Sequence, residues 1–356
     1  MIQAYRHKCR AVTSFLGVLS VVAVLVICMP GAQPAAEEQF SVSDYVTELE
    51  WLVHDEGWTR NKTLQALGLS EDELRRRIAA FTPNAKPIYG QDNRVDWYQI
   101  PRGRIRSLVA ATPALVKPKG VVSDDDKMFK LVGVPLGKYL KLCPDAAFRN
   151  QLKVSYCSGT LISKDRVLTA GHCVRELAKS ENVPYAKDIW FVFGFRVYEK
   201  DHSGATELTK RQMYRGKRLI RGSPPSKQDW ALVELQRDVH RQIAKPIEKI
   251  RNTEVENKKT ALSGINYPSG LPVKYADGAK VTFNNEKKYF VADLDAFTGG
   301  SGGGVYDENG ALAGVLIRGA PDYKLDKKRG CKIERGCPTT GCSGEHVSRI
   351  TLMDLN

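Results

Sequence analysis

The sequence of 356 residues lacks several features that define other classes of protein. It contains no internal repeat, which excludes a solenoid or a propeller built from repeated units. It has no arginine-rich segment interleaved with aromatic residues, so nothing in it indicates a nucleic-acid-binding protein. It has only 6 histidines, and no cluster of metal ligands stands near the motifs described below. We therefore expect no nucleic-acid partner, no cofactor and no metal.

The composition is that of a soluble globular protein, with 42% hydrophobic and 26% charged residues. The length allows two or three domains, or one large and one small domain. The net charge of +14 favours contact with anionic surfaces such as lipid headgroups or cell-envelope polymers. Solubility alone is a competing explanation for this charge.

Residues 1–36 have the pattern of an export signal. Arg6, Lys8 and Arg10 precede an uncharged run over residues 11–29, and small residues follow. The run approaches the roughly 20 residues that span a bilayer, and no clear Ala-x-Ala cleavage site follows it. An uncleaved anchor with its basic end in the cytoplasm is therefore an alternative to a cleaved signal. We expect a periplasmic or secreted protein, or one anchored to the inner membrane with the rest of the chain outside the cytoplasm.

Six cysteines follow the signal, and an even number in an exported chain predicts disulfides. They are Cys143, Cys157, Cys173, Cys331, Cys337 and Cys342. Cys157 and Cys173 enclose the segment that contains His172, so a disulfide between them would hold that histidine in place. A zinc site at the last three cysteines is the alternative, although their spacing is loose for zinc.

The chain divides into regions of different pattern. Residues 37–82 read as a small helical extension with a capping box at Ser70 and Glu73, and we interpret it as a possible pro-region or docking module. Residues 83–127 are rich in proline and basic residues, which suits a linker or an extended arm. Residues 128–356 contain many short apolar strands separated by turn residues, which predicts an all-β barrel or sandwich.

Three segments of the last region carry side chains suited to catalysis. Thr169-Ala-Gly-His172-Cys173 ends an apolar strand, and Asp229 directly precedes another. Ser301 stands among glycines in residues 297–304. A glycine-rich turn can expose a serine hydroxyl and aim two backbone N–H groups at one point. Acyl transfer needs that combination of a nucleophile and an oxyanion hole.

In the order His172, Asp229, Ser301, these segments resemble those of the trypsin-like (chymotrypsin-fold) serine peptidases. The resemblance covers roughly residues 128–356 and is nearest to the bacterial glutamyl-endopeptidase-like branch. It implies an all-β fold of two six-stranded antiparallel β-barrels, preceded here by the helical extension. A turn that begins at Gly264 and reads Gly-Ile-Asn-Tyr-Pro-Ser-Gly supports the alignment.

The resemblance also assigns roles to individual residues. Ser301 would be the nucleophile, His172 the general base and then acid, and Asp229 the residue that fixes the histidine tautomer. The backbone N–H groups of Gly299 and Ser301 would form the oxyanion hole.

The resemblance places the substrate-binding residues on both sides of Ser301. Asp295 lies where an acid selects a basic P1 residue, and Ile317, Arg318 and Gly319 fall on the strand that pairs with extended substrate. Arg318 could instead pair with Asp295 and cancel its charge. On this alignment residues 320–343 are a cysteine-bearing insertion.

Two positions of the serine loop depart from the familiar motif. Gly300 replaces the aspartate that precedes the nucleophile, so the usual zymogen switch is expected to be absent. Gly304 replaces a proline and adds backbone freedom to the loop.

The sequence therefore supports two hypotheses of different class. The first is an exported serine endopeptidase that forms an acyl-enzyme on polypeptide substrates, with a preference for a basic P1 residue. The second is a catalytically idle barrel that binds peptides or envelope polymers, which the glycines of the loop and the net charge motivate.

Overall fold

The structure is a computed structural model that describes residues 88–90, 92–123, 125, 127–319, 322–337 and 344–355. The chain divides into two compact units, Met1–Pro83 and Asn84–Asn356, and the described residues all lie in the second. The predicted signal or anchor at 1–36 and the predicted helical extension at 37–82 lie outside the described residues. No helix within the described ranges is both long and apolar enough to cross a bilayer.

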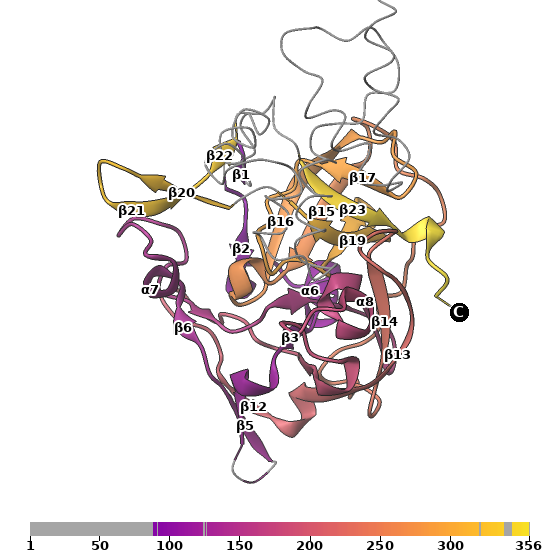
Figure 1. Ribbon diagram of the computed structural model, residues 1–356, viewed down its shortest axis with the longest axis horizontal. Helices are drawn as coiled ribbons and strands as arrows, with labels where there is room; N and C mark the ends of the chain where they lie inside the picture. Colours follow the sequence, from indigo (N-terminus) through magenta and orange to yellow (C-terminus); the bar gives the residue numbers. More distant parts are fainter. Residues whose placement is uncertain are drawn as a thin grey trace, which may run out of the picture. The chain divides into compact units, whose positions relative to one another are not determined.

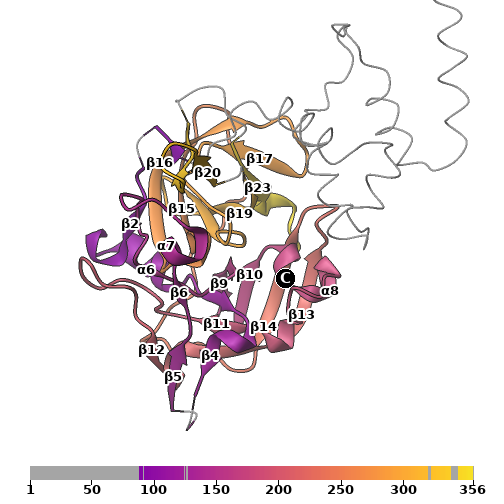
Figure 2. The same cartoon turned by 60° about the vertical axis from the view of Figure 1, so that its left-hand side comes forward.

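One sheet contains seven antiparallel strands in the order β8-β3-β11-β13-β14-β10-β9. Its strands are β3 (Ala114–Val116), β8 (Cys157–Ser158), β9 (Thr160–Ser163), β10 (Arg166–Thr169), β11 (Trp190–Val192), β13 (Met213–Ser223) and β14 (Trp230–Leu235). The two outer strands, β8 and β9, belong to one stretch of chain interrupted only at Gly159. The sheet is therefore a nearly closed barrel, drawn mostly in magenta to pink in Figures 1 and 2.

A second sheet has the order β15-β18-β19-β23-β17-β16-β2, and an additional pairing of β15 with β16 closes it into a barrel. Its strands are β2 (Val95–Asp96), β15 (Ala261–Asn266), β16 (Lys274–Phe283), β17 (Tyr289–Ala292), β18 (Gly304–Asp307), β19 (Leu312–Arg318) and β23 (Glu345–Arg349). The ring itself contains six strands, and β2 is added outside it along β16. Figures 1 and 2 both draw this barrel in orange and yellow beside the first one.

The remaining elements are short and lie around the two barrels. A small sheet has the order β12-β5-β4, two hairpins pair β6 with β7 and β20 with β21, and β1 pairs in parallel with β22. These strands are β1 (Ile88–Tyr89), β4 (Val121–Val122), β5 (Met128–Leu131), β6 (Val134–Pro135), β7 (Leu152–Lys153), β12 (Glu207–Thr209), β20 (Tyr323–Asp326), β21 (Cys331–Glu334) and β22 (Gly336–Cys337). The helices are α6 (Arg104–Ala110), α7 (Leu136–Leu140) and α8 (Arg175–Ala178), with 3-10 turns η1 (Trp97–Gln99), η2 (Pro118–Gly120), η3 (Gly171–Cys173), η4 (Ala186–Asp188), η5 (Lys210–Gln212), η6 (Pro268–Gly270) and η7 (Ile350–Leu352).

Apolar side chains from opposite strands fill the interior of each barrel. Leu115 and Phe191 are fully buried in the cluster of the first barrel, and Phe290 and Val347 are fully buried in the cluster of the second. Burial of apolar surface contributes about 25 cal/mol per Å² and dominates the stability of such a fold. The predicted all-β, two-barrel, chymotrypsin-like architecture is confirmed, and the described ranges contain few helices.

Residues 88–123 differ from the linker or arm that the sequence predicted. β3 lies inside the first barrel sheet between β8 and β11, and β2 pairs with β16 of the second. The prolines stand between these short elements; Pro118, for example, begins η2 directly after β3. A proline fits such a boundary because its fixed φ suits a turn. The prediction of a linker was therefore wrong for residues 88–123, because it relied on composition alone and these residues contribute strands to both barrel sheets.

Candidate active site

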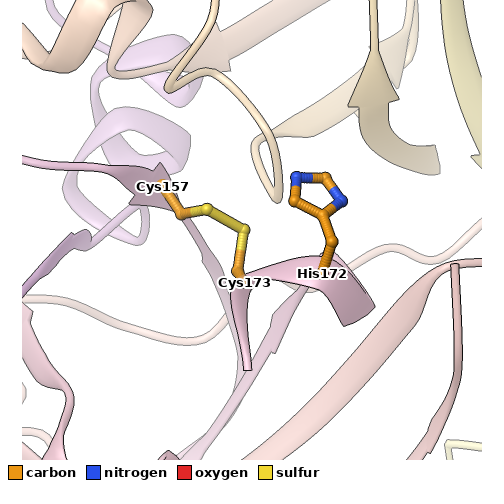
Figure 3. Close-up of side chains that lie close together, drawn as sticks. All are labelled: Cys157, His172 and Cys173. Carbon is orange, nitrogen blue, oxygen red and sulfur yellow. A yellow bond between two sulfur atoms is a disulfide. The ribbon is translucent and has the colours of Figure 1, made fainter. Parts of the chain in front are cut away.

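His172 lies in the one-turn helix η3, immediately after β10 brings the chain out of the first barrel. A disulfide between Cys157 and Cys173 joins the strand β8 to the same turn, as the sequence predicted (Figure 3). The turn is crowded: a Cβ on Gly171 would lie 2.5 Å from the carbonyl oxygen of Ser223. The disulfide and the packing together fix the backbone that carries His172, whose side chain is 32% exposed.

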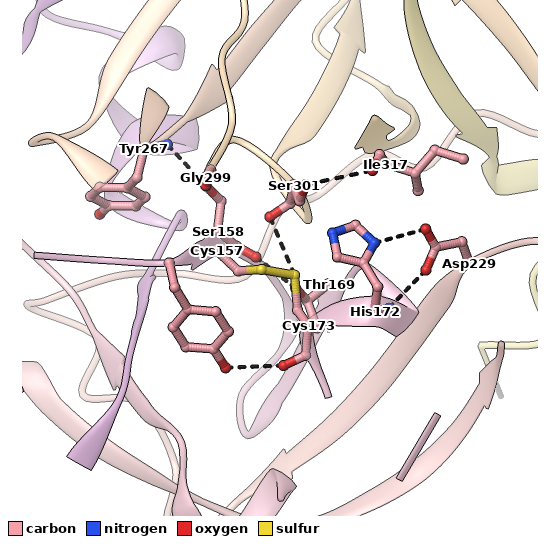
Figure 4. Close-up of a disulfide and its surroundings, with 11 residues drawn as sticks. Cys157, Ser158, Thr169, His172, Cys173, Asp229, Tyr267, Gly299, Ser301 and Ile317 are labelled. Atoms are coloured by element: carbon pink, nitrogen blue, oxygen red, sulfur yellow. Dashed lines mark hydrogen bonds and ion pairs between the residues drawn. A yellow bond between two sulfur atoms is a disulfide. The ribbon is translucent and has the colours of Figure 1, made fainter. Parts of the chain in front are cut away.

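Asp229 is buried directly before β14 and faces His172. Its backbone adopts φ +57°, a left-handed conformation that aspartate tolerates better than most residues. One carboxylate oxygen accepts the backbone N–H of His172 at 2.8 Å, and the other lies 2.8 Å from His172 Nδ1 (Figure 4). The carboxylate therefore fixes both the position and the ring orientation of the histidine.

Ser301 lies in the loop before β18, and its side chain lies near that of His172 between the two barrels. Figure 4 shows it on the side of the imidazole that carries the ring nitrogen not bonded to Asp229. The Ser301 hydroxyl donates to the carbonyl oxygen of Ile317 over 3.5 Å, a long and weak hydrogen bond. The structure thus brings all three predicted catalytic side chains to one place.

The carbonyl groups of the serine loop are anchored on the side away from the site. Thr298 O accepts the Ser269 N–H at 2.6 Å, and Gly300 O accepts the Gly303 N–H at 2.9 Å. In a trans peptide the C=O and N–H groups point in opposite directions. These anchors therefore turn the N–H groups of Gly299 and Ser301 the other way, and in the described part of the chain neither donates a hydrogen bond.

Ser158 is a residue of this site that the sequence analysis missed. It is fully buried, its hydroxyl donates to Gly299 O at 3.0 Å, and its N–H donates to Ser301 O at 2.7 Å (Figure 4). The same hydroxyl accepts the Tyr267 N–H at 2.9 Å. Ser158 thereby ties the serine loop to the first barrel. The only signal in the sequence is its place next to Cys157.

Cys157, His172 and Cys173 present three potential ligand atoms within 4.8 Å of one another. The two sulfur atoms are bonded to each other, as Figure 3 shows, and a metal binds thiolates rather than a disulfide. Cys331 is likewise bonded, to Cys143, so it cannot supply a thiolate to the alternative zinc site that the sequence left open.

Asp295 is buried, and both of its oxygens are occupied by the segment near β1. Oδ1 accepts the Tyr89 N–H at 2.7 Å and Oδ2 accepts the Asn93 N–H at 3.0 Å. Burial raises the pKa of Asp295 to about 6, although the two N–H groups act in the opposite direction. Within the described residues, no ion pair joins it to Arg318, so the anticipated cancellation of charge is not seen.

Glu345 is a second acid near the predicted substrate-binding residues. It begins β23, is 2% exposed, and lies directly against Gly319, where an added Cβ would come within 1.7 Å of Glu345 Oε2. Burial raises the pKa of Tyr89, and the nearby Glu345 charge raises it further. The Glu345 carboxylate is therefore close to both Gly319 and the Tyr89 ring.

The end of β19 has an open side next to Ser301. β18 pairs with β19 only as far as Gly304 opposite Val315, whereas β23 continues along the other side to His346 opposite Arg318. In the described ranges no strand pairs with Ile317–Gly319 on the open side. Exposed strand edges of this kind can accept an extended peptide.

Residues 157–315 match the model of a family described as the trypsin-like peptidase domain. The matched stretch includes His172, Asp229 and Ser301. The matched stretch is therefore similar to a trypsin-like peptidase domain, and it lies within the two antiparallel barrels.

The chain is also similar in fold to several solved structures. Human heparin binding protein is 13% identical with a TM-score of 0.43, over 71% of this chain and 91% of that one. An atomic-resolution structure of HBP is 14% identical with the same TM-score, over 71% and 90%. A Glu endopeptidase in complex with MPD is 16% identical with a TM-score of 0.36, over 65% and 94%. None of the curated proteins compared with the sequence matches it.

Proposed function

We propose that the protein is an exported serine endopeptidase whose catalytic triad is Ser301, His172 and Asp229. The observation that carries this proposal is the pair of 2.8 Å contacts from one buried carboxylate to the backbone and the ring of His172. That arrangement holds Nδ1 as the protonated nitrogen and leaves Nε2 as a base on the side of Ser301.

The reaction begins with a rotation of the Ser301 side chain. Its bond to Ile317 O is long, and a change of χ1 to another staggered rotamer turns the hydroxyl toward His172. Ser301 Oγ then attacks the scissile carbonyl carbon while His172 takes the hydroxyl proton, and Asp229 stabilises the imidazolium. His172 next protonates the leaving amine, which leaves an acyl-enzyme. Water attacks this ester by the same route and releases the product acid.

The negative charge on the tetrahedral intermediates is met by the N–H groups of Gly299 and Ser301. Both are oriented by anchored carbonyl groups, so no reorganisation is needed as the charge develops. Loss of one such donor costs about 10²–10³ in rate in other enzymes of this mechanism.

A fluorophosphonate probe tests the assignment directly. We expect labelling of the wild type at Ser301, none of Ser301→Ala, and a loss of about 10⁴ in kcat for Asp229→Asn, which keeps the shape of the side chain but supports the wrong tautomer. Ser163→Ala on β9 is the matched control and should label normally. An unlabelled wild type beside a labelled control protease would refute the proposal.

We further propose a preference for a basic P1 residue. The Glu345 carboxylate lies directly beside Gly319, at the end of the strand that would pair with substrate, and is our candidate to meet a cationic side chain. Profiling of P1 libraries should favour Lys or Arg, and Glu345→Gln should lower kcat/KM for those substrates but not for a leucine substrate. A preference for glutamate would contradict this proposal and would favour the glutamyl-endopeptidase branch.

Export is proposed from the N-terminal signal and is supported by the two disulfides, which persist in oxidising compartments. Fractionation of cells expressing the full chain distinguishes a periplasmic or secreted product from a membrane-anchored one. Recovery of the protein in the cytoplasm with reduced cysteines would exclude export.

A catalytically idle binding module is the second candidate. The observation that favours it is the orientation of the Ser301 hydroxyl toward Ile317 O. In that case Ser301→Ala would leave both the phenotype and partner binding unchanged, and the wild type would show no turnover of any peptide library.

A further inference from the structure

The insertion after β19 reaches the loop that carries the nucleophile. The carboxylate of Asp322 accepts the Thr298 N–H at 2.9 Å, and the Tyr323 hydroxyl hydrogen-bonds Ser269 Oγ at 2.9 Å. The Tyr323 ring also packs edge-on against Phe297, with ring centroids 5.4 Å apart. Two consecutive residues of the insertion therefore contact the serine loop and the turn that supports it.

Thr298 is the residue whose conformation sets the direction of the Gly299 N–H. Its own N–H is held by Asp322, and its carbonyl is held by the Ser269 N–H. Because the Gly299 N–H belongs to the same peptide plane as the Thr298 carbonyl, it points away from Ser269. With both flanking peptides of Thr298 bonded, this plane cannot turn over without breaking a hydrogen bond.

Ser269 needs support because its backbone is in an unfavourable conformation. It is a non-glycine residue with φ +56°, a left-handed conformation that is unfavourable for a residue with a side chain. Its side chain is bonded to Tyr323. The insertion thus supplies one hydrogen-bond partner of Thr298, which is Asp322, and supports the other, which is Ser269.

The insertion is itself held in place. β20 and β21 form a hairpin, and a disulfide links Cys331 of β21 to Cys143 near α7. The Arg335 N–H donates to Asp322 O at 3.0 Å, and Arg335 Nε donates to Tyr323 O at 3.2 Å. Asp322 and Tyr323 are therefore presented from a rigid hairpin base.

We propose that Asp322 is a positioning residue for the oxyanion hole, which fixes the Thr298 amide and thereby directs the Gly299 N–H toward the developing charge. The hydrogen bonds of Asp322 go to Thr298 and Arg335 rather than to Ser301, so it acts through the serine loop. The proposal rests on the proposed serine-peptidase function and adds to it a dependence on the insertion.

Asp322→Ala and Asp322→Asn form the test pair, because asparagine retains an oxygen that can accept the Thr298 N–H. We expect Asp322→Ala to lower kcat by about 10- to 100-fold, since a misdirected donor costs less than a missing one, with KM changed little. The inhibition constant of a peptide trifluoromethyl ketone, which forms a tetrahedral adduct at the serine, should rise by the same factor. Asp322→Asn should retain nearly the wild-type values.

Asp326→Ala is the matched control at the other end of β20. Its carboxylate accepts backbone N–H groups of the hairpin turn and does not contact the serine loop. Wild-type kcat in this variant together with loss in Asp322→Ala supports the proposal. An equal loss of kcat in Asp326→Ala and Asp322→Ala would overturn the proposal, because the effect would then come from the hairpin as a whole. An equal loss of kcat in Asp322→Ala and Asp322→Asn would also overturn it, because the effect would then come from the negative charge.

Amide hydrogen exchange gives a second measurement that needs no variant. The Thr298 amide of the wild type should exchange slowly, and rapid exchange would overturn the proposal even if Asp322→Ala fails to fold. A wild type that neither turns over substrate nor labels at Ser301 refutes the proposed function instead. An active wild type with an unaffected Asp322→Ala variant overturns only the role of Asp322.

Discussion

Gly302, the residue after the candidate nucleophile, lies where the serine loop approaches the first barrel. It has φ +87°, and a Cβ there would lie 2.1 Å from Ser158 O and 2.2 Å from Thr169 Oγ1. Gly278 has a similar φ of +76° but open space, with its nearest atom at 3.6 Å. The two glycines therefore share a backbone conformation and differ in their surroundings.

Alanine substitution at the two positions separates these effects. Gly278→Ala should cost roughly 1–2 kcal/mol of unfolding free energy for the left-handed conformation alone. Gly302→Ala should cost at least about 1–3 kcal/mol more, because the loop must move away from Ser158. Urea denaturation measures both, and equal losses would show that the contact with the first barrel is unimportant.

Asp295 predicts a pH dependence of stability. Its pKa rises from the ordinary 3.8 to about 6 in the folded protein, chiefly through burial. Between these values the folded state holds a proton that the unfolded state has released, so rising pH lowers the free energy of unfolding. Asp295→Asn removes this titration, and its stability relative to the wild type should improve as pH rises from about 4 to 6.

Denaturation of Asp295→Asn and the wild type at several pH values checks this expectation. Asp201→Asn, on an exposed loop, is the control and should follow the wild type across the range. The expectation would be wrong if the free energy of unfolding depended on pH in the same way for Asp295→Asn and the wild type.

At the residue scale, the sequence predicted the candidate catalytic side chains but not the contacts that fix their positions. His172, Asp229 and Ser301 stand in recognisable local patterns. Ser158 acts on a loop 141 residues away, and no local pattern reports such a contact. The partners of Asp295 are backbone groups about 200 residues earlier, which composition cannot reveal.

At the element scale, Lys274 joins β16 to the segment before the first barrel. It is 1% exposed, and its ammonium donates to Asp96 Oδ1 at 2.6 Å and Gln151 Oε1 at 2.7 Å. Burial lowers the pKa of Lys274 to about 8, while Asp96 acts to raise it. The buried charge is therefore compensated by partners from β2 and from the loop before β7.

Lys274→Met should destabilise the fold by about 3–5 kcal/mol, because Asp96 would be left buried without its cation. Lys280→Met is the matched control, since Lys280 is exposed on the same strand. Thermal and urea unfolding of the two variants give the comparison. A small effect at both positions would mean that Asp96 finds another partner.

Strand patterning predicted the longer strands of the barrels better than the short strands. The run Trp230–Leu235, for example, forms β14 and could be recognised because apolar residues recur between turn residues. β1, β2 and β3 span only two or three residues each, which is too short to establish an alternation. For the insertion, the sequence revealed its cysteines but not that Asp322 meets the serine loop.

At the scale of the whole molecule, the position of β3 limits where the chain can be processed. Because β3 lies inside the first barrel sheet and β2 extends the second, cleavage after Ile88 would remove parts of the fold. We expect any mature form to begin upstream of Ile88, within the predicted helical extension or directly after it.

Two truncated chains test this limit. A chain that begins at Asn84 should unfold cooperatively, whereas one that begins at Pro118 lacks β2 and β3 and should be insoluble or unfold without cooperativity. Equal stability of the two would contradict the structural role of the early strands. Intact-mass measurement of the protein purified from the cells that make it locates the natural terminus independently.

The two barrels also occupy successive portions of the chain. Every strand of the first sheet lies between Ala114 and Leu235, whereas all of the second sheet except β2 comes from Ala261 onward. During synthesis from the N-terminus, His172 and Asp229 can therefore reach their places in the first barrel before Ser301 has been made. On the proposed function, the nascent chain would therefore hold its general base before its nucleophile, and it would become able to hydrolyse other polypeptides only near the end of synthesis.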